Sequence, residues 1–309
     1  MVYETSVRLS FSCCWNSGQS KDGEKMLENI LKLGFDHVEL GHGVRLSLME
    51  GIQKVFNRGD VRFSSLHNFC PLPVEITQAS PNCYQFTSHI AAQRERALKL
   101  SYQTIDWAAR LQAPNVVLHL GSVPMGPVTD ELGEMILQGK QFTREYTHKK
   151  LASVKERETK APLYVKRSTE ALKKIAAYAA ERDIHLGVES REAYEELPTE
   201  REMIPILDEI DSPYVGYWHD FGHVQLKHNL SFLDHYEWLN SMRNRLIGCH
   251  LHDTKWPNQD HHIPGDGSID YDRLVPLVPP ETFFVWELSP KRPAEDIIIA
   301  RRKWLERFG

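Results

Sequence analysis

The segment from residue 166 to residue 189 reads KRSTEALKKIAAYAAERDIHLGVE, and its pattern decides the fold. Its first part, Lys166–Arg182, has apolar residues three and four positions apart, as in an amphipathic helix. Its last part, residues 184–189, is a short apolar run that ends in Glu189, which is typical of a buried parallel strand. The segment therefore predicts a helix followed by a strand with a reactive residue at its end.

The same unit recurs along the chain. We expect strands near residues 5–12, 36–40, 62–66, 115–119, 184–189, 214–218, 247–252 and 282–287. Helical patterns lie between them, for example at Lys25–Leu33, Ala91–Leu111 and Glu295–Glu306. Eight strands that alternate with about eight helices predict an α/β fold, a closed (β/α)8 TIM barrel. An open doubly wound sheet is the alternative, but it would normally carry a glycine-rich phosphate loop after its first strand, which residues 12–16 (SCCWN) are not.

Composition places few further limits on the protein. The chain has 309 residues and a formal net charge of −5, which suits a single barrel domain over residues 1–309 and excludes a strongly basic nucleic-acid-coating protein. No run of about 18 apolar residues occurs, so we expect no membrane span. Residues 1–10 lack a long apolar core, so we expect no signal peptide. Five cysteines without a C-x-x-C pair suit a cytoplasmic protein.

The longest irregular stretch, residues 121–162, follows the fourth strand as an insert. We expect some helix within it, around residues 131–158, and a role as a lid or as a contact between subunits of a homo-oligomer. From Lys140 to Lys174, eleven Lys or Arg residues stand against four Glu. This basic stretch is either a solvated helix face or a wall that attracts anions, since loops after barrel strands lie on the catalytic face.

Six successive strands end in a histidine, an aspartate or a glutamate. In chain order these residues are His67, His119, Glu189, Asp220, His250 and Glu287. His223 follows Asp220 by three residues, and Asp260 and His262 lie in the loop after the seventh strand. The carboxyl ends of all barrel strands face the same way, so these side chains should converge. Their nitrogen and oxygen atoms suit Zn²⁺, Mn²⁺ or Fe²⁺.

The number of candidate ligands predicts more than one metal ion. Nine ligands are too many for one ion and about right for two or three, if carboxylates bridge the ions. Carboxylates clustered without cations would repel one another, so the arrangement itself favours bound cations. We therefore expect two to three divalent ions per chain, while some of the nine residues can instead orient the ligands or bind substrate.

These residues resemble the xylose isomerase-like TIM-barrel superfamily, which includes sugar isomerases and epimerases and endonuclease IV. Four residues match the single-metal set of the isomerases and epimerases: Glu189, Asp220, His250 and Glu287. The resemblance implies that Glu189 and Glu287 are also catalytic, as acid and base on a substrate carbon. Residues 262–270 (HIPGDGSID) look like a loop of the same enzymes.

The full set of nine is similar, position for position, to the three-zinc site of endonuclease IV. The resemblance assigns the ions to three groups: His67, His119 and Glu189; Glu189, Asp220, His250 and Glu287; and His223, Asp260 and His262. The chain departs from that family after Asp220, where it reads FGHVQL, and in its insert at residues 121–162. These departures count against DNA as the substrate.

Two reactions follow from these alternatives. The first is hydrolysis of a phosphoester, in which two close ions activate a hydroxide and Lys255 and the basic stretch attract the anion. Trp15 and Trp256 are then candidate aromatic contacts to the substrate, although each also suits packing at the barrel rim. We favour this reaction because His67, His119 and the Asp260–His262 pair are hard to explain with one ion.

The second reaction is isomerisation or epimerisation of a ketose or a related hydroxy-carbonyl compound. One metal ion would polarise the substrate oxygens, and a glutamate would remove the proton beside the carbonyl. Arg191, two residues past Glu189, and Glu39, on the second strand, are candidate substrate contacts. In either case we expect a small-molecule sugar or phosphoester as the substrate.

Overall fold

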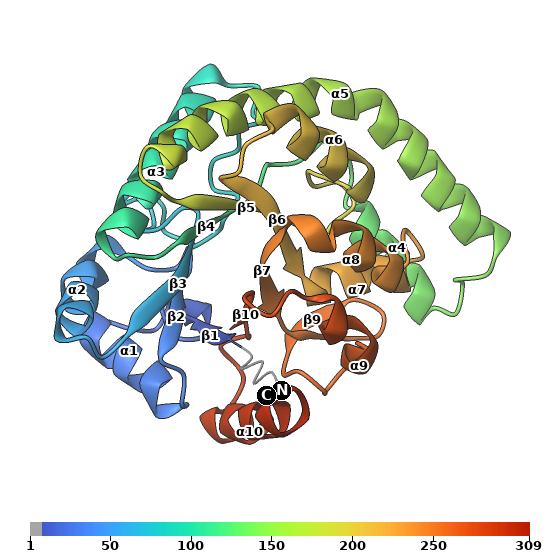
Figure 1. Ribbon diagram of the computed structural model, residues 1–309. Coiled ribbons are helices and arrows are strands. Elements are labelled where there is room, and N and C mark those ends of the chain that lie inside the picture. Colours follow the sequence, from blue (N-terminus) through green and yellow to red (C-terminus); the bar gives the residue numbers. More distant parts are fainter. Residues whose placement is uncertain (1–7) are drawn as a thin grey trace.

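The computed structural model describes residues 8–309, and its main strands close into a parallel barrel (Figure 1). The barrel order is β1-β10-β7-β6-β5-β4-β3-β2. The strands are β1 (Arg8–Ser12), β2 (His37–Leu40), β3 (Arg62–His67), β4 (Asn115–Leu118), β5 (His185–Glu189), β6 (Val215–Asp220), β7 (Leu246–Leu251) and β10 (Phe283–Trp286). The predicted (β/α)8 barrel is confirmed, while residues 5–7 of the expected first strand lie outside the described residues.

Helices surround the barrel, as Figure 1 shows. They are α1 (Gly23–Lys32), α2 (Met49–Arg58), α3 (Ala91–Arg110), α4 (Val128–Leu137), α5 (Arg144–Ala180), α6 (Glu200–Ile210), α7 (Phe221–Asn229), α8 (His235–Met242), α9 (Tyr271–Leu274) and α10 (Ala294–Phe308). A short antiparallel hairpin of β8 (Asp253–Lys255) and β9 (Gln259–His262) follows β7. No helix within residues 8–309 is both long enough and apolar enough to cross a membrane.

The insert after β4 contains helix around residues 131–158, as expected, and divides it between two helices. It forms α4 and the first half of α5, which continues without a break through Pro162 into the predicted helix at 166–182. A proline inside a helix removes a hydrogen bond and normally ends or kinks it. Here Pro162 is exposed, while buried residues on both sides, such as Tyr146 and Leu172, hold α5 against the protein. Tertiary packing against α3, α4 and α6 therefore outweighs the local penalty.

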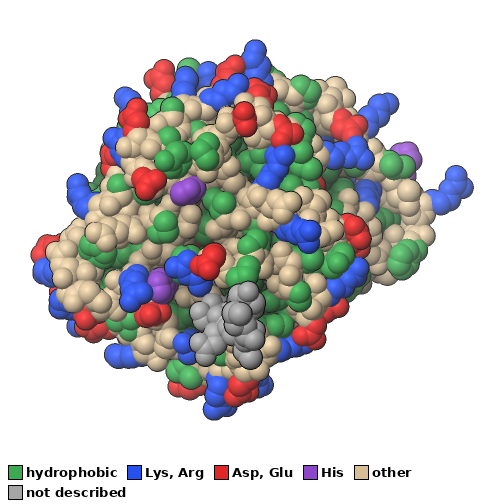
Figure 2. Space-filling view, viewed as in Figure 1, with side chains coloured by type: hydrophobic (Ala, Val, Ile, Leu, Met, Phe, Trp, Pro, Cys, Tyr) green, Lys and Arg blue, Asp and Glu red, His purple; other side chains and the backbone are tan. Residues whose placement is uncertain are grey.

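The basic stretch lies mainly along α5, where its cations meet acidic groups. Lys149 pairs with Glu131 of α4, and Lys173 Nζ lies 2.8 Å from Glu209 Oε1 of α6. Figure 2 shows Lys or Arg and Asp or Glu side chains interspersed along the upper edge, over α5. The stretch thus resembles a solvated helix face. A role for the insert as a lid or subunit contact stays a prediction, and Phe142, between α4 and α5, is 94% exposed.

The barrel interior below the strand ends is filled by Trp218 of β6. Its side chain is fully buried and packs with Val117 and Val285. Two strand glycines make room for it, because a Cβ atom on Gly248 would lie 2.0 Å from Cζ3 of the indole and one on Gly187 would lie 2.7 Å from Cε3. Side chains two residues apart on a strand share a face, so Trp218 forms the layer next to Asp220 and closes the floor under it.

Candidate metal centre

The ends of β5, β6, β7 and β10 bring four ligand groups together in the centre of the barrel. Glu189, Asp220, His250 and Glu287 are all buried, and one ligand atom of each lies within 4.8 Å of the others. Nδ1 of His250 lies 3.4 Å from Glu189 Oε1, 3.2 Å from Glu287 Oε2 and 3.6 Å from Asp220 Oδ2. Three carboxylates thus converge on one imidazole nitrogen, a donor set that fits Zn²⁺, Mn²⁺ or Fe²⁺.

The electrostatics of this four-residue group favour a cation. Burial would raise the pKa of Glu189, but the positive charges of Arg191 and His250 hold it well below its ordinary value. Burial also opposes ionisation of Asp220, yet His223 and His252 keep its pKa well below the ordinary value. Both carboxylates are therefore ionised at neutral pH. They place concentrated negative charge in a closed space from which most water is excluded.

Glu39 lies against Nε2 of His250, the ring nitrogen opposite the one that faces the three carboxylates, and its expected contact with substrate stays a prediction. It is fully buried on β2, and its Oε2 accepts hydrogen bonds from His250 Nε2 (3.0 Å) and from Ser65 Oγ (2.7 Å). Because Nε2 of His250 donates to Glu39, Nδ1 is free to face the other carboxylates. A carboxylate that holds the far nitrogen of a histidine in this way orients the ring and makes it a stronger metal ligand.

Replacing Glu39 by glutamine should weaken metal binding by about 10- to 100-fold, the usual effect of losing such a supporting carboxylate. The amide keeps the shape of the side chain but loses the charge that polarises His250. Competition against a chromophoric chelator measures the affinity. Glu50→Gln on α2, whose side chain is 82% exposed, is the matched control and should bind metal as the unchanged protein does. Equal affinity in both variants would show that Glu39 does not support His250.

A second group shares Glu189. His67 Nε2 lies 3.3 Å and His119 Nε2 lies 2.8 Å from Glu189 Oε2, and both histidines are buried. The guanidinium of Arg191 enters this group, with Nη1 2.7 Å from His119 Nε2 and 3.1 Å from Glu189 Oε1. Burial, followed by the charge of Arg191, lowers the pKa of His119 to about 3, so this imidazole is neutral. Arg191 is 5% exposed and binds these protein groups, and its expected contact with substrate stays a prediction.

A third group lies around His223 and includes a residue that the sequence did not reveal. Glu192, His223 and Asp260 each offer an atom within 4.8 Å of the others. Burial, together with the charge of Asp260, raises the pKa of Glu192 to about 7. Its position three residues after Glu189, in the loop that follows β5, was the available signal.

The structure brings His261, rather than His262, into a ligand group with His223 and His252. We predicted His262 because the spacing of Asp260 and His262 resembles that of the third ion's ligands in endonuclease IV, whereas side chains two residues apart share a direction only in a regular strand. However, His261 has a φ of 51°, in the left-handed region, and this interrupts the alternation within β9. Among the described residues, His262 belongs to none of the ligand groups.

A family model described as a xylose isomerase-like TIM barrel matches residues 27–308. The chain belongs to this family. The resemblance inferred from the strand ends is therefore confirmed at the level of the family.

Individual relatives of this xylose isomerase-like chain are distant. An uncharacterised protein, y4fM, of Sinorhizobium fredii is 25% identical over 229 residues, which are 72% of this chain and 61% of that protein. The chain thus spans about three fifths of the length of this curated relative. A D-tagatose 3-epimerase-like protein has a TM-score of 0.69 at 16% identity, with 97% of this chain and 96% of that chain covered.

Two further solved structures share the fold. The 3-keto-D-glucoside 4-epimerase YcjR from E. coli has a TM-score of 0.67 at 14% identity, with 97% of this chain and 99% of that chain covered. The IolI protein with a bound zinc atom has a TM-score of 0.64 at 15% identity, with 96% of each chain covered. At these identities the similarity establishes the shared fold.

The remaining predicted substrate contacts of this xylose isomerase-like protein lie at the rim of the barrel. Trp15 is partly buried, packs edge-on against Phe11 and donates from Nε1 to the carbonyl of Arg292 (2.9 Å), so it acts in rim packing. Lys255 and Trp256 are exposed on the β8–β9 hairpin and belong to none of the ligand groups among the described residues. Their contact with a substrate stays a prediction.

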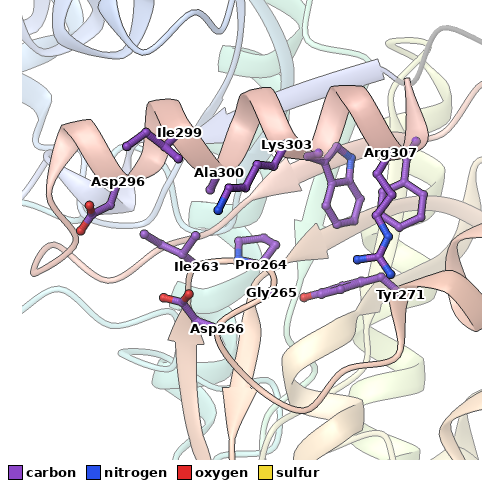
Figure 3. Close-up of a pocket in the computed structure, with 12 residues that line it drawn as sticks. Ile263, Pro264, Gly265, Asp266, Tyr271, Asp296, Ile299, Ala300, Lys303 and Arg307 are labelled. Atoms are coloured by element: carbon purple, nitrogen blue, oxygen red, sulfur yellow. The ribbon is translucent and has the colours of Figure 1, made fainter.

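A separate pocket lies outside the barrel, between α10 and the loop after β9 (Figure 3). It has a volume of about 540 Å³. Asp266 and Asp296 bring negative charge to it, and Lys303 and Arg307 bring positive charge. None of the four ligands at the strand ends lines this pocket, so we assign the metal chemistry to the barrel centre.

Proposed function

We propose that the protein is a metal-dependent epimerase or isomerase that acts on a ketose or a related hydroxy-carbonyl compound. This proposal rests mainly on the convergence of three buried carboxylates on Nδ1 of His250. This group would hold one divalent cation through Glu189, Asp220, His250 and Glu287. Among the solved structures with this fold, one is named a D-tagatose 3-epimerase-like protein and another a 3-keto-D-glucoside 4-epimerase. A third, the IolI protein, contains a bound zinc atom. They support this function over phosphoester hydrolysis.

The chain's own residues suit a proton transfer at carbon. A bound cation would draw electrons from the carbonyl and hydroxyl oxygens of the substrate and so acidify the C–H beside the carbonyl. Glu189 and Glu287 reach the group from β5 and β10, with β6 and β7 between them in the barrel order. The two carboxylates therefore approach a substrate carbon from different sides. One takes the proton from that carbon, and the other returns a proton to it.

Burial protects this chemistry from water. Glu189 is 1% exposed and Glu287 is 6% exposed, so a substrate bound against them displaces the water that would otherwise compete for the proton. His223 Nδ1 lies 3.3 Å from both Glu189 Oε1 and Asp220 Oδ2. We therefore place His223 beside the reacting carbon, where it can bind a substrate hydroxyl.

The first test combines metal content with exchange of substrate hydrogen. Protein purified without chelator and without a histidine-rich tag should contain one equivalent of Zn, Mn or Fe by elemental mass spectrometry. Incubation in D₂O with a panel of ketoses should place deuterium on a carbon beside the carbonyl of at least one sugar, detected by NMR. Removal of the metal with a chelator should stop the exchange, and added metal should restore it.

The competing hydrolase hypothesis predicts a different result from the same protein. It requires two or three equivalents of metal, release of product from a phosphodiester such as abasic DNA, and no deuterium exchange into sugars. That combination would overturn the proposed function.

A further inference from the structure

We propose that Arg191 is a built-in cation that closes the second ion position, formed by His67, His119 and Glu189, and so keeps a second ion out of that position. The inference rests on the proposed function only in taking the four-residue group as the site of that first ion. It explains why the chain holds ligand-type histidines that a single ion does not use.

The guanidinium occupies the ligand atoms that a second ion would need. Nη1 of Arg191 lies 2.7 Å from His119 Nε2 and 3.1 Å from Glu189 Oε1, within hydrogen-bond distance of both. An ion ligated by His119 needs the same lone pair on Nε2 that accepts the hydrogen bond from Nη1. Binding of that ion would therefore displace the guanidinium.

A closed ring of hydrogen bonds keeps Nε2 of His119 directed at Arg191. His119 Nδ1 donates to Asn82 Oδ1 (3.3 Å), and Asn82 Nδ2 donates to Glu196 Oε1 (3.0 Å). Arg191 Nη2 donates to the same Glu196 oxygen (3.1 Å), and Nη1 completes the ring at His119. Because Asn82 donates to the Glu196 carboxylate, its Oδ1 must face His119. His119 thus carries its proton on Nδ1 and presents a lone pair on Nε2.

His67 already has partners for both ring nitrogens. Its Nδ1 donates to the carbonyl oxygen of Asn68 (3.1 Å), and its Nε2 lies 3.3 Å from Glu189 Oε2. His67 Nε2 and His119 Nε2 thus both face Glu189 Oε2, as the ligand atoms of the four-residue group face one another, and the guanidinium of Arg191 is what distinguishes the second group.

The positive charge of Arg191 also disfavours a second cation at this position. A guanidinium stays charged at all pH values at which the protein is folded. The side chain is 5% exposed, so solvent screens it poorly, and Glu196 anchors it from the far side. Glu196 Oε2 is itself held by the backbone N–H of Ala193 (3.1 Å). The guanidinium therefore has a fixed position, and a second cation beside it would be repelled.

The experiment counts the metal ions bound per chain in the unchanged protein and in the variant Arg191→Gln. Apoprotein is titrated with Co²⁺ while the visible absorption of the ion is followed, and elemental mass spectrometry of the zinc-loaded proteins gives an independent count. We expect one ion per chain in the unchanged protein and two in Arg191→Gln. The double variant Arg191→Gln, His119→Ala is the matched control and should return to one ion, because it removes a ligand of the second position.

A second variant keeps the test decisive if Arg191→Gln fails to fold. Glu196→Gln leaves the arginine in place but weakens its anchor, so it should also take up a second ion, at higher Co²⁺ concentration. Two ions in the unchanged protein, or one ion in each folded variant, would overturn the inference and leave the proposed metal-dependent reaction standing. No ion in any of these proteins would overturn the proposed function, and this inference with it.

Discussion

Glu189→Gln is expected to abolish turnover. Glu189 faces Arg191, His67, His119, His223 and His250, all within 3.4 Å. A glutamine has nearly the same shape, but it carries no charge for these groups and cannot take a proton from carbon. We expect the rate to fall by at least about 10²- to 10⁴-fold, the contribution of a positioned acid–base group. Deuterium exchange into the substrate measures the rate, and circular dichroism checks the fold.

The matched control for this variant is Glu306→Gln. Glu306 lies near the end of α10 and is exposed, and its one ion pair among the described residues is a long one with Arg302 (3.9 Å). The control should retain the full rate, because a weak surface pair contributes little. Turnover by Glu189→Gln at the rate of this control would remove Glu189 from the catalytic machinery and contradict the proposed mechanism.

Trp218→Ala is expected to cost about 3–5 kcal/mol of unfolding free energy, the usual range for truncating a buried aromatic side chain. The indole is fully buried and fills the space that Gly187 and Gly248 leave open inside the barrel. Strand glycines have no side chains that can move into the cavity, so the site can collapse only a little. Its ring centroid also lies 5.4 Å from that of His250, so metal affinity should fall as well. Urea unfolding monitored by circular dichroism measures the stability change.

Trp256→Ala provides the comparison at an exposed site. Trp256 is 50% exposed on the β8–β9 hairpin, and the same truncation should change stability by no more than about 0.5 kcal/mol. If both variants unfold at the same urea concentration as the unchanged protein, Trp218 does not support the barrel interior.

Much of the first group of ligands could be predicted from local sequence patterns. Glu189, Asp220 and His250 each lie at or near the end of a short apolar run, and parallel barrel strands all end at one face. Their convergence therefore follows once the alternation of helices and strands has indicated the barrel. The family resemblance rested on the same residues and was confirmed by the match over residues 27–308.

The interpretation of the extra histidines depended on residues distant in sequence. The count of nine ligands favoured several ions and a hydrolase, because the sequence does not show which other side chains lie between the histidines. The structure places the guanidinium of Arg191 against His119 and links it through Glu196 to Asn82, which lies in the long segment before α3. No local pattern indicates which way an arginine in a loop turns or which carboxylate anchors it.

The sequence by itself determined the barrel and the set of residues at its strand ends, because hydrophobic periodicity and strand length are local properties of the chain. Only the tertiary structure decided the depth and partners of each polar group. Glu39 reaches His250 across the barrel, with β1 and β10 between their strands, because barrel closure and stagger bring distant strands to the same level. Likewise, α5 continues through Pro162 because tertiary packing on both sides of the proline outweighs its local penalty. His261, and not His262, lies in a ligand group because the left-handed backbone at His261 interrupts the strand.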